Sequence, residues 1–150
     1  KAGVGAEFHY EAVPPFRITG VSARELLPSE YLSRMLLHNR EFGDDVRFEG
    51  YLDAEQPSLI VSQPHTKGAP ATDEDMIGQM LQLDYLSLGM LEIGKAGSIS
   101  FYHPERRIAV FDAHPGNFFR AGDITIPIDR IIAEIGSEAE HSWLLDRATS

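Results

Sequence analysis

Four polar residues in the last third of the chain have the types and the spacing that catalysis would need. Asp112, His114 and Asn117 lie within the segment 112–117 (Asp-Ala-His-Pro-Gly-Asn), and Asp129 comes twelve positions after Asn117. A carboxylate such as that of Asp112 can accept or orient the proton of a hydroxyl group. The side-chain oxygens of Asn117 and Asp129 are hard ligands suited to Mg²⁺. This combination favours a site for phosphoryl-transfer chemistry.

The chain around Asp112 predicts a strand that ends in a tight bend. Residues 108–111 (Ile-Ala-Val-Phe) form an apolar run typical of a strand, so Asp112 is expected where that strand ends and a loop begins. The Pro-Gly pair at 115–116 bends the chain, and Asn117 starts the next strand. An acid and an amide on either side of such a bend can point into one pocket.

A second predicted hairpin accounts for Asp129. Segments 117–120 and 123–128 flank the Ala-Gly pair at 121–122 and predict two strands joined by a turn. Because side chains alternate along a strand, the three isoleucines of the second segment share one face, and Asp129 lies on the other. The hairpin would fold Asp129 back toward the end that carries Asn117 and supply a second oxygen ligand.

The alternative for the same residues is a structural role. The segment 112–117 could be a tight Pro-Gly loop in which Asp112 caps its own backbone, as Asp and Asn often do. His114 is then expected to shape the loop rather than to titrate. A zinc site built from His65, His103 and His114 is disfavoured, because these residues lack the local spacing of zinc ligands.

The rest of the chain predicts strands and helices in a mixed order. Thr72 followed by three acidic residues predicts the start of a helix, and 22–25 has the spacing of a capping box and predicts a short helical turn. We expect Leu32, Met35, Leu36 and Asn39 on the inner face of the first helix. The other expected elements are strands at 7–13, 16–19, 46–52 (half-buried), 58–62 (interior), 98–102 and 107–111, and helices at 29–42, from 73 onward and 137–147. This order favours an α+β fold over a repeated parallel βαβ unit.

Length and composition limit the classes of protein to consider. The 150 residues predict one domain, 1–150, and 43% hydrophobic with 24% charged residues is typical of a soluble globular protein. A net charge of -10 argues against nucleic acid as a partner, and no apolar run reaches the roughly 20 residues of a membrane span. The absence of cysteine fits the cytoplasm, and the start without Met suggests a fragment of a larger polypeptide. The sequence gives no indication of oligomeric state.

The segment 112–117 and the later Ile-Pro-Ile-Asp at 126–129 resemble the catalytic segment of phosphotransferases of the aminoglycoside and choline kinase type. By this resemblance Asp112 is the catalytic base, Asn117 and Asp129 are the metal ligands, and His114 shapes the catalytic loop. The resemblance implies an ATP- and Mg²⁺-dependent phosphotransferase, with an acceptor substrate that the sequence does not name.

Two further segments, 37–45 and 61–64, resemble more narrowly the kinase-like domain of bacterial polyvalent proteins, which are found on mobile elements. This likeness implies a minimal kinase-like fold, with an N-lobe type of antiparallel sheet plus helix, a hinge-like loop at 63–68, β-hairpins that carry the catalytic loop, and a reduced C-lobe. Arg17 and Gly5 are the expected cofactor-binding residues. Arg17 would contact the nucleotide, and Gly5 would belong to the remnant of a glycine-rich loop.

The chain departs from the kinase pattern in ways that keep other functions open. Kinases place a Lys on the strand after the glycine-rich loop, where this chain has Arg17, and either Glu30 or Glu41 could be the helix partner of that cation. No Asp-Phe-Gly or Ala-Pro-Glu motif is present. One alternative is a catalytically inactive kinase-like module that makes protein contacts within a larger bacterial or mobile-element protein. Another is a metal-dependent hydrolase that uses the same acids.

Overall fold

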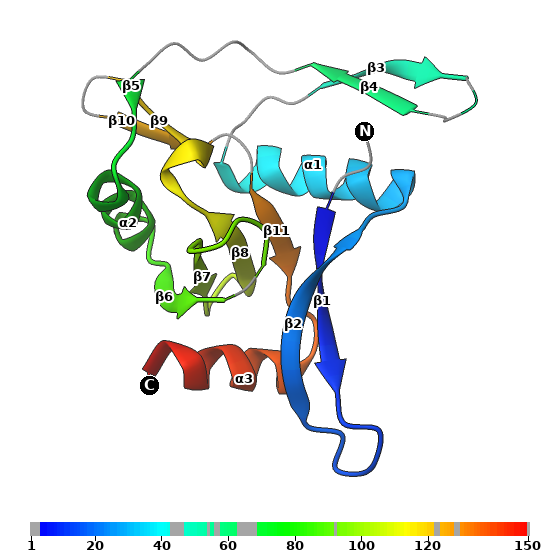
Figure 1. Cartoon of the computed structure of the whole chain (residues 1–150), viewed down its shortest axis with the longest axis vertical. Helices are drawn as coiled ribbons and strands as arrows, with labels where there is room; N and C mark the ends of the chain where they lie inside the picture. The colour runs from blue at the N-terminus through cyan, green and yellow to red at the C-terminus, as the bar shows by residue number, and fades with distance from the viewer. Residues whose placement is uncertain are drawn as a thin grey trace.

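The computed structural model in Figure 1 describes residues 4–42, 47–53, 55, 58–62, 69–91, 93–121, 124–127 and 130–149. These residues form an α+β fold with antiparallel sheets and three α-helices, which confirms the predicted fold class at this level. None of the described helices has both the length and the apolar character that crossing a membrane requires.

The strands are β1 Val4–Tyr10, β2 Ile18–Glu25, β3 Arg47–Leu52, β4 Ser58–Ser62, β5 Ala69–Pro70, β6 Leu86–Met90, β7 Ile99–His103, β8 Ile108–Ala113, β9 Phe118–Ala121, β10 Ile124–Pro127 and β11 Ile131–Glu134. The helices are α1 Pro28–Phe42, α2 Asp73–Gln82 and α3 Glu138–Thr149, and Pro115–Asn117 forms a single 3₁₀ turn. Helices were expected at all three of these places, and the hairpins β7–β8 and β9–β10 were also expected.

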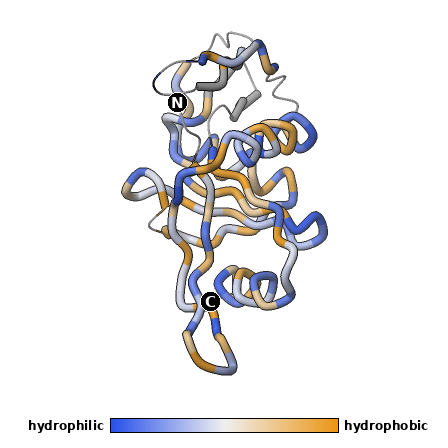
Figure 2. Tube along the Cα trace, turned by 90° about the vertical axis from the view of Figure 1, so that its right-hand side faces the viewer, coloured by the Kyte–Doolittle hydropathy of each residue, from blue (hydrophilic) through white to orange (hydrophobic). Residues whose placement is uncertain are grey.

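A four-stranded antiparallel sheet in the order β11-β8-β7-β6 forms the centre of the molecule, and both of its faces are covered. On one face, side chains of α1 and α2 pack against the sheet. On the other face, α3 and the β1–β2 hairpin pack against it, as the views in Figures 1 and 2 also show. The buried side chains of the first core include Leu37, Met76, Met80, Phe101, Ile108 and Val110. The buried side chains of the second core include Tyr102, Ala109, Phe111, Ile131 and Leu144.

The capping-box spacing at 22–25 does not start a helical turn, so this prediction is wrong. Strand β2 continues through these residues, and Ser22 lies opposite Glu7 in the antiparallel pairing with β1. Pairing along the whole hairpin outweighs the weak local preference for a turn. The helix begins instead at Pro28, where Glu30 accepts a hydrogen bond from the main-chain N–H of Leu27 at 3.0 Å.

The burial predicted for the first half of the chain is also partly wrong. In α1 the buried residues are Met35 and Leu37, whereas Leu36 is 70% exposed. Strand β4 is not interior, because it pairs with β3 in a separate two-stranded sheet. Phe48 of β3 and Ile60 of β4 are about half exposed, at 55% and 47%. This small sheet therefore contributes little to the two cores.

Candidate functional site

Asp112 is the last residue but one of β8, with a backbone φ of 59°. This left-handed conformation is uncommon for a residue with a side chain, although Asp tolerates it better than most. It interrupts the alternation of the strand: Phe111 belongs to the core beneath α3, whereas Ala113 belongs to the core beneath α1 and α2. Asp112 therefore lies at a β-bulge near the end of a buried strand, where the pairing of β8 with β7 shifts register, close to where the sequence placed it.

The carboxylate of Asp112 is held through one of its two oxygens. Oδ1 accepts hydrogen bonds from the main-chain N–H of Lys95 at 2.7 Å and from the hydroxyl of Ser98 at 3.0 Å. Nε2 of His114 lies 3.6 Å from the same oxygen. Within the part of the chain that the structure describes, Oδ2 makes no hydrogen bond, and the side chain is 22% exposed. One carboxylate oxygen is thus fixed by the loop, whereas the described residues leave the other without a hydrogen bond.

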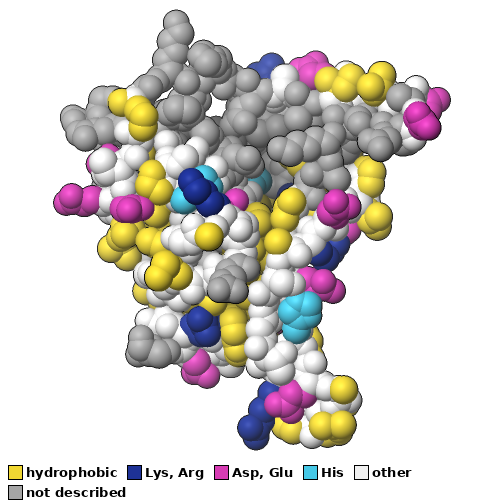
Figure 3. Space-filling view, viewed as in Figure 1, with side chains coloured by type: hydrophobic (Ala, Val, Ile, Leu, Met, Phe, Trp, Pro, Cys, Tyr) yellow, Lys and Arg dark blue, Asp and Glu magenta, His cyan; other side chains and the backbone are white. Residues whose placement is uncertain are grey.

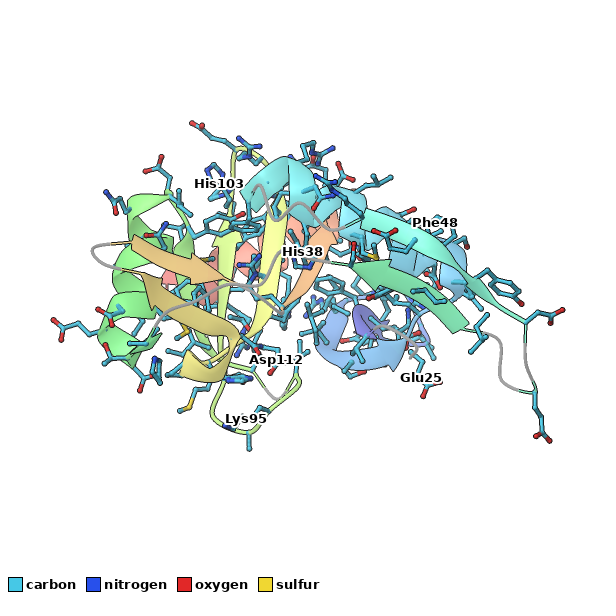
Figure 4. All side chains as sticks on the ribbon, turned by 90° about the horizontal axis from the view of Figure 1, so that it is seen from above. Glu25, His38, Phe48, Lys95, His103 and Asp112 are labelled. Carbon is cyan, nitrogen blue, oxygen red and sulfur yellow. The ribbon has the colours of Figure 1, made fainter. Side chains whose placement is uncertain are left out.

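The loop that donates both hydrogen bonds to the Asp112 carboxylate connects β6 and β7. Figure 4 shows Lys95 on this loop close to Asp112. Gly94 and Gly97 have φ values of +78° and +83°, which glycine adopts without steric cost. The approach at Gly94 is close, because a methyl group there would lie 2.2 Å from Cγ of Asp112. Glycine at position 94 is therefore needed for both its backbone conformation and its small size.

Asn117 lies beside Asp112, as the Pro-Gly bend predicted. Its side-chain amide donates a hydrogen bond of 2.8 Å to the main-chain carbonyl oxygen of Asp112. Its main-chain N–H donates to the carbonyl oxygen of His114 at 2.8 Å and closes the 3₁₀ turn. The residue is buried, and its Oδ1 makes no hydrogen bond to the described residues. Because Nδ2 is used in holding the loop, Oδ1 is the atom left for a ligand.

His114 packs within the bend that it was predicted to shape. A methyl group at Gly116 would lie 2.9 Å from two atoms of the His114 ring, so the ring sits directly on the turn. Its Nδ1 is buried and has no hydrogen-bond partner among the described residues. These contacts fit the expected structural role in the loop.

Asp129 lies outside the described residues, so its part in the site stays a prediction. The hairpin expected to carry it is present, with β9 and β10 paired antiparallel. Pro127 lies opposite Phe118, the residue after Asn117. The described end of β10 therefore returns to the start of β9, in the direction that the sequence predicted.

The structure does not bring Arg17 or Gly5 to Asp112. Arg17 is exposed in the turn between β1 and β2, which projects away from the four-stranded sheet in both Figures 1 and 2. Gly5 lies within β1 opposite Arg24, and a methyl group there would come within 2.5 Å of the Leu26 side chain. Gly5 therefore serves the packing of the hairpin, and the turn 11–17 contains no glycine.

The two candidate acids of α1 pair with other cations. Glu30 accepts two hydrogen bonds from the guanidinium of Arg24, one of them at 3.1 Å. These bonds, followed by the one from the N–H of Leu27, lower the pKa of Glu30 to about 2. Glu41, whose side chain is 4% exposed, contacts Arg106 at 2.6 Å. Neither pair reproduces the pairing that the kinase resemblance implied for Arg17.

No pattern in the sequence assigns the loop 94–98 (Gly-Lys-Ala-Gly-Ser) to the site. The sequence predicts a glycine-punctuated stretch after a helix, whereas strand β6 precedes the loop in the structure. Its two glycines are the signal that could have been used, since glycine permits left-handed backbone and a close approach of the main chain to a neighbouring group. What the sequence could not provide was the contact between this loop and a residue 17 positions later in the chain.

The possible metal ligands are few. No group of three or more His, Asp or Glu residues that could hold a metal occurs in the described part of the chain. Mg²⁺ does not need such a group, because it commonly keeps several waters and binds one or two protein oxygens together with phosphates. The residues present fit that mode through Asn117. Of the three histidines considered for zinc, His65 lies outside the described residues, and Nδ1 of His103 accepts a hydrogen bond from the N–H of Arg106 while its ring packs against Tyr85.

Comparisons of this chain with protein-family models, with curated proteins and with solved structures gave no match, so its function is inferred from the geometry of the site.

Proposed function

We propose that the protein is an ATP- and Mg²⁺-dependent phosphotransferase with a minimal kinase-like fold, related to the kinase-like domains of bacterial polyvalent proteins. The observation that carries this proposal is the carboxylate of Asp112, which is fixed through Oδ1 and makes no hydrogen bond to the described residues through Oδ2. A carboxylate that is oriented on one side and accessible on the other is suited to bind an incoming hydroxyl group.

Asp112 would act on the acceptor. Its Oδ2 would accept the hydrogen bond of the acceptor hydroxyl and direct the hydroxyl oxygen toward the terminal phosphate. The two hydrogen bonds to Oδ1 keep the carboxylate from turning, which reduces the entropy lost when the acceptor binds. His114, 3.6 Å from Oδ1, would help to keep this side of the carboxylate in place.

Asn117 and Asp129 would hold the metal. Because the amide nitrogen of Asn117 is bonded to the carbonyl oxygen of Asp112, its Oδ1 has a defined direction relative to the catalytic acid. An Mg²⁺ ion bound there would neutralise charge on the phosphates during transfer. Asp129, two positions after the end of β10 in the sequence, is the proposed second ligand.

Calorimetric titration with ATP, with and without Mg²⁺, tests the proposal. We expect binding that is stronger with Mg²⁺, and we expect Asn117→Ala and Asp129→Ala to remove the gain that Mg²⁺ provides. Asp112→Asn keeps an acceptor oxygen for Lys95 and Ser98 but cannot take up a proton, so it should bind ATP and fail to transfer phosphate. Absence of ATP binding under both conditions would exclude the function.

A second candidate function, a kinase-like module that makes protein contacts without catalysis, is favoured by one observation. Apolar side chains are exposed along the end of α2 and on β6, an edge strand of the central sheet, on a side of the molecule that Figure 3 shows. These side chains are Leu81 (52% exposed), Leu83 (39%), Leu86 (38%) and Met90 (72%). This candidate predicts no ATP turnover, so turnover above background that Asp112→Asn abolishes would exclude it.

A further inference from the structure

We propose that the loop 94–98 binds the phosphate groups of the nucleotide and that Lys95 is its phosphate-contacting cation. This inference rests on the proposed phosphotransferase function and adds a binding element to the same site. It assigns to Lys95 the task that the kinase resemblance gave to Arg17.

A phosphate-binding site needs a cation, and Arg17, the cation that the kinase resemblance implied, does not lie near Asp112. The chain has a net charge of -10, which opposes the approach of a polyphosphate unless positive charge is concentrated at the site. Arg17 cannot supply that charge, because the turn that carries it projects from the far end of the β1–β2 hairpin. Lys95 can, because its main-chain nitrogen lies 2.7 Å from the carboxylate of Asp112.

The loop is clamped to the catalytic acid at two points. Lys95 binds Oδ1 of Asp112 through its main chain, and Ser98 binds the same oxygen through its hydroxyl. The N–H of Ser98 also donates to the carbonyl oxygen of Lys95 at 3.1 Å, which closes the loop into a turn. The backbone of Lys95 is therefore fixed beside the acid, while its exposed ammonium group moves on a flexible four-carbon stem.

The main chain of the loop offers further donors. The N–H groups of Ala96 and Gly97 are not hydrogen-bonded to any described residue, and residues 94–97 are exposed. A methyl group placed on Gly97 would meet nothing within 4 Å, so there is open space on that side of Gly97. Successive free N–H groups in a turn that includes left-handed residues form a favourable site for an anion. Together with the Lys95 ammonium, they suit a phosphate group of a nucleotide.

The loop 94–98 lies next to Asp112, so the two could bind the two substrates side by side. Phosphates held at Ala96 and Gly97 would lie beside Asp112, whose Oδ2 is open to the acceptor. The loop would hold the group to be transferred, and Asp112 would orient the group that receives it. The loop would thus position the phosphates directly and the acceptor indirectly, through its bonds to Asp112.

The test measures two ligands by calorimetry: ATP with Mg²⁺, and inorganic tripolyphosphate without metal. For Lys95→Met we expect the affinity for both to fall about tenfold or more, which corresponds to the loss of one charge-assisted contact. Arg17→Met is the matched control and should bind both ligands as the wild type does. Lys95→Met should fold normally, because the bond to Asp112 comes from the main chain.

The outcomes separate this inference from the proposed function. If the wild type binds ATP with Mg²⁺ and Lys95→Met binds it equally well, the loop assignment is wrong and the phosphotransferase function stands. If tripolyphosphate binding depends on Lys95 but the wild type does not bind ATP with or without Mg²⁺, the loop assignment stands and the function is wrong. If the wild type binds neither ligand, both are wrong.

Discussion

The side-chain amide of Asn117 donates a hydrogen bond of 2.8 Å to the main-chain carbonyl oxygen of Asp112. This bond spans the bend between β8 and β9 and fixes the proposed metal ligand relative to the proposed catalytic acid. Because the amide of Asn117 is buried, the bond is sheltered from competition with water.

Removal of this bond should affect stability and metal binding in separable ways. Asn117→Ala should lower the free energy of unfolding by about 1–2 kcal/mol, since the carbonyl oxygen of Asp112 loses its partner. Asn117→Asp also loses the donor but keeps an oxygen for the metal. Urea unfolding should therefore show a loss for both variants, whereas the Mg²⁺-dependent gain in ATP affinity should be lost only in Asn117→Ala. Equal stability of wild type and both variants would show that the bond contributes nothing.

Gly94 and Gly97 provide a matched pair of substitutions. Both have positive φ, so alanine at either position should cost about 1–2 kcal/mol through the backbone. At Gly94 the new methyl group would also meet Cγ of Asp112, whereas at Gly97 it would meet nothing within 4 Å. We expect Gly94→Ala to lose about 1–3 kcal/mol more than Gly97→Ala in thermal or urea unfolding. Equal losses would mean that the loop moves away from Asp112 without cost.

The start of α2 gives a prediction that does not depend on function. Thr72 and Asp75 form a reciprocal capping box, with two bonds of 3.1 Å between side chains and main-chain N–H groups. Thr72→Ala should lower the free energy of unfolding by about 1 kcal/mol, and Thr72→Ser, which keeps the hydroxyl, should lose much less. Chemical denaturation of the three proteins at neutral pH measures the difference, and identical midpoints would argue against the cap.

The Arg24–Glu30 pair predicts how stability depends on pH. The pKa of Glu30 is lowered from 4.5 to about 2, mainly by the hydrogen bonds from Arg24 and then by that from the N–H of Leu27. A lowered carboxyl pKa stabilises the folded state above pH 4.5 and loses this effect as the pH falls toward 2. The stability difference between wild type and Glu30→Gln should therefore be constant from pH 7 to about 4.5 and shrink below it.

Arg24→Met supplies the control for that experiment. Without the guanidinium, the main cause of the shift is gone, so the effect of Glu30→Gln should depend much less on pH in this background. Urea unfolding of the four proteins between pH 7 and pH 2.5 gives the comparison. A difference that keeps its size down to pH 2.5 in the wild-type background would contradict the assignment.

Sequence patterns predicted the elements near Asp112 well because the signals there are local. The apolar run before Asp112, the Pro-Gly bend and the turn after β9 each depend on a few adjacent residues. The structure brings Asp112 and Asn117 together for the same reason, since a short bend leaves their side chains few alternatives. The start of α2 at Thr72 was equally readable, because its cap lies within four residues.

What the sequence could not predict depends on contacts between distant segments. Lys95 becomes part of the site through a bond to Asp112 that forms only when β7 and β8 pair. Ser22 to Glu25 follow their strand partners rather than their capping spacing, and β11 gains its place from pairing with β8. The residue type of Arg17 and its position in the chain predicted a nucleotide contact. The β1–β2 hairpin is long, however, and its turn places Arg17 far from Asp112.

The interrupted side-chain alternation at Asp112 has a consequence for how the protein unfolds. Phe111 is anchored in one hydrophobic layer and Ala113 in the other, so the residue between them is a shared boundary of both layers. Local unfolding of either core would free one sequence neighbour of Asp112. The Asp112 carboxylate would then lose its fixed position beside the loop 94–98. Ligand binding at this acid should therefore vanish in the main cooperative melting of the sheet and not in an earlier, local fraying event.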